Sequence, residues 1–339
     1  MMFMVLFLSG LVNGLGRAII ASIDQIDAPY YLVSDSSENL ITVSNLSPDT
    51  LQQLQEMTDA KLAPLNIQRM YLSKSDSEEK MDIHYFAIEA GSFLEPNVQE
   101  GTSLADATCE NPIILDDDYK ADGTSLGDIV KDSTTGMEFQ VVGFSKDQMY
   151  GHTSVGFITK ESYTVLRTAI NPNYEPMIHS IVIQGNDIEK IDIKGTMVAG
   201  KTDIINQLPG YTAEKTTITM VIWMLVVISA AVIGVFYYIL TIQKEKQFGI
   251  MKAMGVTMRE IGGLICSQVM IVVCFGAIVA NLLAFGMAAF LPQAMPFYLT
   301  VSNACIVTVA FIAISLISSL LSIRKVAKVD PMKSIGGAE

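Results

Sequence analysis

The sequence predicts an α-helical membrane protein with four transmembrane helices and one large α+β extracytoplasmic domain between the first and second helices. Half of the 339 residues are apolar, yet the chain carries 35 acidic and 22 basic side chains. A chain divided between membrane and water combines these properties more readily than one globular domain does. The charges are also segregated, because residues 24–217 hold 31 of the acidic and 13 of the basic side chains. The acidity therefore belongs to one domain.

Residues 1–23 form the first apolar run, which we interpret as transmembrane helix 1. The run has no basic start and no clear cleavage site, so a retained helix is favoured over a signal peptide. It is also short for a span, and we expect this chain to start late, at an internal methionine. Gly10 and Gly14 have the G-x-x-x-G spacing that lets another helix pack closely, and simple tolerance of glycine is the alternative explanation.

Residues 24–217 are predicted to form the extracytoplasmic α+β domain, and they are enough to bury a core of their own. Ser47-Pro48 is a typical helix start, an N-cap followed by proline in the first turn. Only Cys109 of the four cysteines lies in this domain, so no disulfide can form within it. The domain has no basic patch for a nucleic acid. Clusters of β-branched and aromatic residues predict strands at residues 30–33, 84–89, 139–144 and 180–184.

Three further apolar runs predict transmembrane helices 2, 3 and 4, at residues 218–242, 261–291 and 299–323. The first of these runs has 25 uncharged residues. At about 1.5 Å rise per residue it can cross a hydrocarbon layer of about 30 Å. Lysines and arginines lie in the connector 243–260 and in the tail 324–339. The positive-inside rule therefore places connector and tail in the cytoplasm and the large domain outside the cell membrane.

The connector has a helical pattern of its own. Phe248, Met251 and Met254 are spaced by three, which predicts that they share one face of a short helix, and Gly255 stands where that helix would stop. The sequence from Thr257 to Glu260 predicts a capping box that starts the next helix. Such a helix between two spans could receive force from a soluble partner. A solvated turn whose lysines only fix the topology is the alternative.

Two segments resemble the ABC-transporter permeases of the FtsX/MacB superfamily: the connector QKEKQFGIMKAMGVTMREI and the closing segment IRKVAKVDPMKSIGG. NPIILDDDYKADGTSLGDIVKDSTTGMEFQVVGF similarly resembles the MacB-like extracytoplasmic core. The resemblance implies a homodimer of non-catalytic permease subunits in membrane lipid, working with two copies of a separate ATPase subunit. The family's basic segment before the first helix is missing here. The resemblance also implies that the ATPase docks on the coupling residues Phe248, Ile250, Met251, Lys252, Met254 and Gly255.

Within that family, the short chain, the acidic domain and YYILTIQKEKQFGIMKAMG are most similar to the heme-efflux permeases of Gram-positive bacteria. This resemblance implies heme as the exported substrate, with no cofactor bound by the chain. An FtsX-like regulator of an extracellular partner, or an exporter of a peptide or lipid, is the alternative. An interfacial aromatic belt with packed methionines is the favoured explanation of the residue types that could bind heme, and heme ligation is the alternative. Those candidates are Tyr30, Tyr31, Tyr211, Met220, Trp223 and Met224.

Other chemistries find no support in the sequence. There is no G-x-x-x-x-G-K-[ST] motif, so a driven process needs an ATPase from another chain. His84, His152 and His179 lack ligand spacing, and residues 116–118 lack the alternate spacing of a calcium loop, so no metal site is predicted. No complete span carries a central charge, which disfavours a proton-coupled carrier. The amides within the spans, Gln268, Asn281 and Asn303, are expected to join helices or to line a substrate path.

Overall fold

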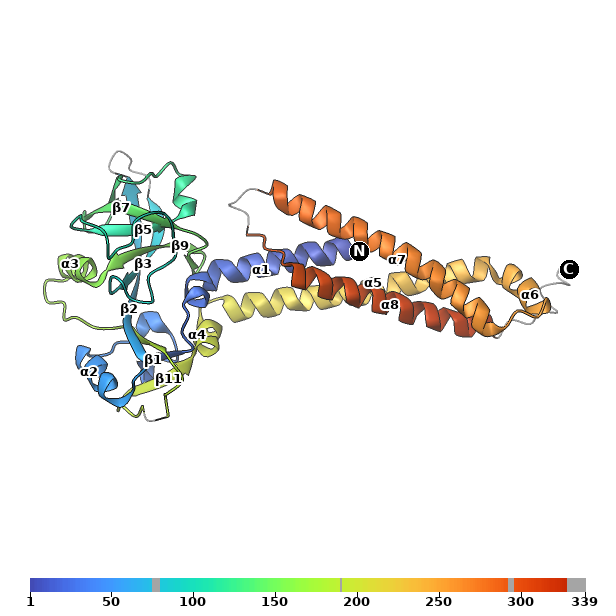
Figure 1. Ribbon diagram of the computed structural model, residues 1–339, viewed down its shortest axis with the longest axis horizontal. Coiled ribbons are helices and arrows are strands. Elements are labelled where there is room, and N and C mark those ends of the chain that lie inside the picture. The colour runs from blue at the N-terminus through green and yellow to red at the C-terminus, as the bar shows by residue number, and fades with distance from the viewer. Residues whose placement is uncertain (75–79, 190, 292–295, 328–339) are drawn as a thin grey trace. The chain divides into compact units, whose positions relative to one another are not determined.

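The computed structural model describes residues 1–74, 80–189, 191–291 and 296–327. Contacts divide the chain into two units. We call residues 15–214 the α+β unit, and residues 1–14 with those from 215 onward the helical unit. All described strands belong to the α+β unit, whereas the long helices lie wholly or mostly in the helical unit; Figure 1 shows the strands and the long helices.

The α+β unit begins inside the first long helix, at residue 15. It contains β1 (Tyr30–Ser34), α2 (Pro48–Met57), β2 (Lys61–Lys74), β3 (Met81–Ile88), β4 (Val98–Gly101), β5 (Pro112–Asp116), β6 (Ile129–Asp132), β7 (Glu138–Ser145), β8 (Met149–Tyr150), β9 (Thr153–Thr159), α3 (Lys160–Ile170), β10 (Ser180–Gln184), β11 (Thr196–Gly200) and α4 (Lys201–Gln207). Short 3-10 turns cover Asp35–Ser37, Ile41–Val43 and Asp117–Lys120.

Two sheets share the long strand β2. Its first half pairs with β10, which continues the order β11-β1-β10-β2. Its second half pairs with β3, and the pairing then runs through β9, β5, β7 and β6 back to β2. The second sheet is therefore a closed ring of strands around a core of large side chains that includes Tyr85, Phe139 and Phe144. Closure leaves these strands without the free edges that invite aggregation.

All four predicted strands are confirmed, as β1, β3, β7 and β10. The predicted helix start is also confirmed, because the Ser47 hydroxyl accepts a hydrogen bond from the Asp49 amide at 3.3 Å and Pro48 is the first helical residue. Ser47 thereby satisfies an amide that has no partner inside the helix.

The helical unit holds most of the long apolar helices. In the described part of the chain, four helices are long and apolar enough to cross a membrane. They are α1 (Met2–Gln25), α5 (Tyr211–Gln243), α7 (Met258–Phe290) and α8 (Val301–Ala327, with its apolar window at Val301–Ser319). The helix α5 starts several residues before the predicted span at residue 218, because Glu214 and Lys215 lie in a polar first turn. Residues 328–339 of the predicted tail lie outside the described residues.

Helices α7 and α8 run side by side, as Figure 1 shows. The Asn281 amide on α7 donates to the Thr308 hydroxyl on α8 at 3.0 Å. Asn281 therefore joins two helices, one of the two roles expected for it. Near this bond Leu6 of α1 packs with Ala280, Ala284 and Ala304, whose small side chains let the helices approach closely.

Candidate functional site

The connector between α5 and α7 forms a short helix with defined ends. Helix α6 (Glu245–Ala253) starts after Lys244, whose backbone leaves the helical region at φ −98° and ψ 5°. It stops at Gly255, where φ is +90°, a conformation that glycine adopts without strain. The predicted capping box is confirmed, because the Thr257 amide donates to Glu260 Oε2 at 2.9 Å and the Glu260 amide donates to Thr257 Oγ1 at 3.4 Å. These caps fix where α6 ends and α7 begins.

The predicted coupling residues do not all face the same way. Phe248 is 4 % exposed and packs with Tyr237 of α5 and Ile265 of α7, whereas Met254 is 70 % exposed. The prediction that Phe248 and Met254 share one face is therefore wrong. A helix turns by about 100° per residue, so each step of three residues drifts by about 60° and two steps separate the side chains by about 120°.

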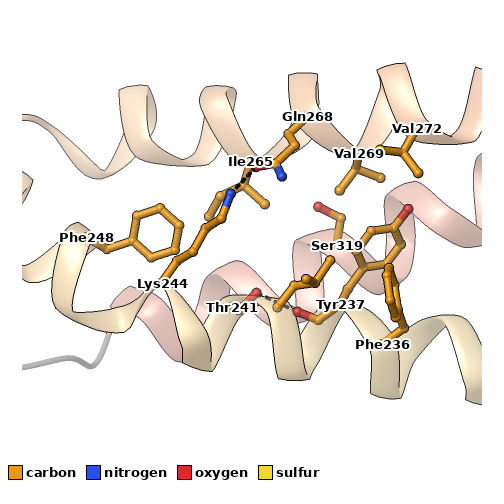
Figure 2. A pocket seen from close by; sticks show the side chains of 11 residues that line it. Phe236, Tyr237, Thr241, Lys244, Phe248, Ile265, Gln268, Val269, Val272 and Ser319 are labelled. Atoms are coloured by element: carbon orange, nitrogen blue, oxygen red, sulfur yellow. Dashed lines mark hydrogen bonds between the residues drawn. The ribbon is translucent and has the colours of Figure 1, made fainter.

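Residues four apart do lie close together on the surface of α6. Ile250 is 46 % exposed and Met254 is 70 % exposed, and they follow the i, i+4 spacing of neighbours on one helix face. Met251 is half-buried and packs against the cluster around Phe248. Helix α6 thus presents an apolar pair on one side and is anchored by Phe248 on another. Figure 2 shows the Phe248 ring beside the Lys244 side chain, at the joint between α5 and α6.

The candidate heme ligands fall into both units. Tyr30 and Tyr31 are adjacent on β1 and so face opposite sides of the sheet. Tyr31 is fully buried, and burial, with Asp24 nearby, raises the pKa of its hydroxyl above the usual value. Tyr211 is also buried, in the same cluster as Tyr31. Tyr31 is thereby corrected from a candidate ligand to a core residue, since a neutral buried phenol cannot reach a ligand from solvent or lipid.

The other three heme candidates form one stripe. Met220, Trp223 and Met224 are 63 %, 65 % and 62 % exposed, and their i, i+3, i+4 spacing places them on one face of α5. They lie in the helical unit. These residues, and not the buried tyrosines, are open to a molecule carried in the membrane.

The α+β unit grips the end of α1 and the start of α5. The amide of His152 donates to the Ala18 carbonyl at 2.8 Å, and the His152 ring lies 3.1 Å from Glu214 Oε1. The Lys201 ammonium donates to the carbonyls of Asp24 and Ile26, at 3.0 and 2.6 Å. These bonds fix the last turns of α1 and the first turn of α5 in the unit. Sequence analysis missed them, because partners so far apart along the chain leave no periodic signal.

Gly10 and Gly14 on α1 meet a segment that is not helical. A Cβ at Gly14 would overlap the Pro296 carbonyl, and one at Gly10 would meet the Phe297 ring at 2.5 Å. The Tyr298 amide also donates to the Gly10 carbonyl at 2.9 Å. The two glycines therefore receive the segment that precedes α8.

Among the described residues, one group of acids could hold a metal ion by distance, Asp116 with Asp117 and Asp118. Asp116 is buried and accepts hydrogen bonds from the amides of Gln148 and Asp118. Burial raises its pKa to about 7. Its oxygens thus cap the following turn, and the cluster is explained as a structural turn.

The elements of the chain are those of a membrane permease. They are four long apolar helices, a short helix between the second and the third, and a large α+β unit between the first and the second. The family FtsX-like permease C-terminal matches residues 219–331. A protein named as the hemin transport system permease HrtB, from Staphylococcus epidermidis, is 30 % identical over 340 residues, covering 100 % of this chain and 93 % of the relative. A protein of the same name from Staphylococcus haemolyticus is 28 % identical over 99 % of this chain and 92 % of the relative.

The chain therefore belongs to the FtsX-like permeases of ABC transporters, together with the HrtB proteins. Among solved structures, the extracellular domain of the ABC-type transporter YknZ from Gram-positive bacteria aligns with 47 % of this chain and 83 % of its own. Its TM-score is 0.32 and its identity 16 %, so no inference is drawn from it.

Proposed function

We propose that this chain is the permease subunit of an ATP-driven exporter. In this proposal it acts as a homodimer with two copies of a separate ATPase, its α+β unit lies outside the cell, and heme taken from the membrane is the substrate. The family supports the ATPase partnership in general terms. The names of the staphylococcal relatives support heme.

The observation that carries the coupling proposal is the division of α6 into two sides. Ile250 and Met254 are exposed and apolar, which suits contact with a soluble partner, whereas Phe248 packs between α5 and α7. A push on the exposed side is therefore passed through Phe248 to both helices. At the other end of α5, the contact between Glu214 and His152 passes the motion to the α+β unit.

Met254→Glu tests this coupling. A carboxylate placed in an apolar contact loses its hydration without gaining a partner, so export should fall at least about tenfold while the fold is retained. ATPase binding, ATP hydrolysis and export would be measured on the reconstituted complex. Met254→Leu keeps an apolar side chain and should retain activity. Gln243→Glu adds the same charge before α6 and should have little effect. Unchanged export in Met254→Glu would contradict docking at this face.

The heme proposal can be tested with a probe that the chain already carries. Trp223 is the single tryptophan and lies in the exposed stripe with Met220 and Met224. Hemin bound there should quench its fluorescence saturably and shift the Soret band, because a thioether is a possible iron ligand. Met220→Leu with Met224→Leu should weaken the Soret shift. A purified protein that gives no Soret shift, or a deletion strain no more sensitive to heme than its parent, would remove heme as the substrate.

A further inference from the structure

A cavity of about 100 Å³ lies inside the helical unit, at the joint between α5 and α6. Its walls come from α5, α6, α7 and α8, and most of them are apolar. Phe236 on α5 and Val272 on α7 line it and are each 53 % exposed, so the apolar wall continues onto the outer surface of the helices. The cavity is thus open to the hydrocarbon of the membrane on one side.

The other end of the cavity is polar. Figure 2 shows the Lys244 ammonium reaching Gln268, whose Oε1 accepts its hydrogen bond at 2.9 Å. An ammonium has three hydrogen-bond donors. Among the described residues, no carboxylate forms an ion pair with the Lys244 ammonium. Ser319 also lines the cavity, and its hydroxyl is fully buried with no hydrogen-bond partner among the described residues. The site therefore offers a positive charge and a free hydroxyl beside an apolar wall.

We propose that this cavity binds the headgroup of an anionic phospholipid of the cytoplasmic leaflet. Lys244 directly follows the last residue of α5, so it lies where the apolar span meets the polar boundary of the membrane. Basic pockets between spans on that side suit anionic headgroups. The phosphate pairs with Lys244 and accepts from Ser319, while an acyl chain lies along Phe236 and Val272.

The size of the cavity favours a lipid headgroup over the porphyrin. Sites for larger organic ligands measure about 300–1,000 Å³. A volume of about 100 Å³ holds a phosphate and its neighbouring groups but not a whole macrocycle.

Phe248 of α6 lines the same cavity, so a bound lipid contacts the helix that we propose to receive force. Occupancy would then stabilise the position of α6 relative to α5. This consequence rests on the proposed function, whereas lipid binding itself does not. The experiment below measures binding without the ATPase or heme, so the two proposals can fail independently.

Binding would be measured on the purified full chain by native mass spectrometry, with phosphatidylglycerol or phosphatidylcholine added. We expect phosphatidylglycerol to be retained preferentially. Lys244→Gln should lower that retention about fivefold, the factor for one basic residue near an anionic surface. Lys244→Arg should restore it. Lys246→Gln is the matched control, because Lys246 is exposed and does not line the cavity, and it should bind as the wild type does.

Ser319→Leu is a second variant that fills the cavity without changing the charge, and it should also lose the lipid. Helical circular dichroism verifies that each variant is folded. Equal retention of the two lipids, or a Lys244→Gln variant that binds phosphatidylglycerol as well as the wild type, overturns the proposal. Displacement of the lipid by one equivalent of hemin would assign the cavity to the substrate and would overturn it as well.

Discussion

At the residue scale, His179 illustrates how the α+β unit responds to pH. Its ring is buried, and its Nδ1 accepts a hydrogen bond from the Ile67 amide at 3.1 Å. Burial, with the charge of Arg167 nearby, lowers its pKa to about 4. The folded protein therefore keeps this imidazole neutral at pH values where the unfolded chain protonates it.

Because the folded pKa of His179 lies below its usual value of 6.5, its contribution to stability is complete above about pH 6.5 and is lost as pH falls toward 4. A shift of this size corresponds to about 3 kcal/mol at most. His84, with a pKa lowered to about 4 mainly by burial, acts in the same direction. Asp116, with a raised pKa of about 7, acts in the opposite direction.

His179→Asn should isolate this contribution, because asparagine offers an acceptor to Ile67 but does not titrate. The free energy of unfolding of the α+β unit would be measured between pH 4 and 7 from the slowest exchanging β2 amides, corrected for intrinsic exchange. We expect a smaller loss of stability on acidification in the variant than in the wild type. Equal pH slopes in the two proteins would show that His179 is not a source of the dependence.

At the scale of elements, two of the three glycines of α1, Gly14 and Gly16, have different surroundings. Gly14→Ala places a methyl group on the Pro296 carbonyl and should destabilise the helical unit by about 1–3 kcal/mol, the usual cost of overpacking. Gly16→Ala is the matched control, because its Cβ would lie 3.7 Å from the Tyr211 ring, an ordinary contact. It should be neutral or stabilising, since alanine favours helix. Thermal unfolding in detergent tests both, and equal melting temperatures would contradict the close contact at Gly14.

The elements that the sequence predicted are those with a local signal. The structure contains the four predicted strands, which are rich in β-branched and aromatic residues. It also contains the capped starts of α2 and α7. Strand β2 was not predicted. It contains Pro64, a residue type that usually argues against a strand, yet Pro64 lies opposite Ile181 in the pairing with β10. Strand β9 was not predicted either, and it contains Gly156, a residue type that weakens a strand pattern. In the ring a Cβ at Gly156 would meet the end of the Ile83 side chain at 2.7 Å, so the glycine lets this side chain pack closely against β9.

The candidate site was predictable to a similar extent. Sequence analysis located α6, its end at Gly255 and the capping box, because each depends on residues close in the chain. The direction of Phe248 was wrong, since it depends on how far the helix turns between residues and on what packs above it. The burial of Tyr31 and the pairing of Lys244 with Gln268 depend on contacts between distant segments, which no local pattern encodes.

At the scale of the whole molecule, the division of charge between the two parts predicts the orientation in the membrane. The acidic residues are concentrated in residues 24–217, and the lysines and arginines of residues 243–260 flank two apolar helices. Under the positive-inside rule this connector is cytoplasmic. We therefore expect the α+β unit on the other side of the membrane, because the apolar helix α5 runs between it and the connector in the sequence.

Cys109 provides a native probe of that orientation. It is half-buried in the α+β unit, whereas Cys266, Cys274 and Cys305 lie in α7 and α8, the helices that we assign to the membrane. A membrane-impermeant maleimide added to intact cells should therefore label the protein at Cys109, because a water-soluble reagent does not reach thiols within the bilayer. Cys109→Ser should abolish the labelling. If labelling appeared only after the cells were permeabilised, the α+β unit would lie in the cytoplasm, and a force relay from α6 to an extracellular domain would be ruled out.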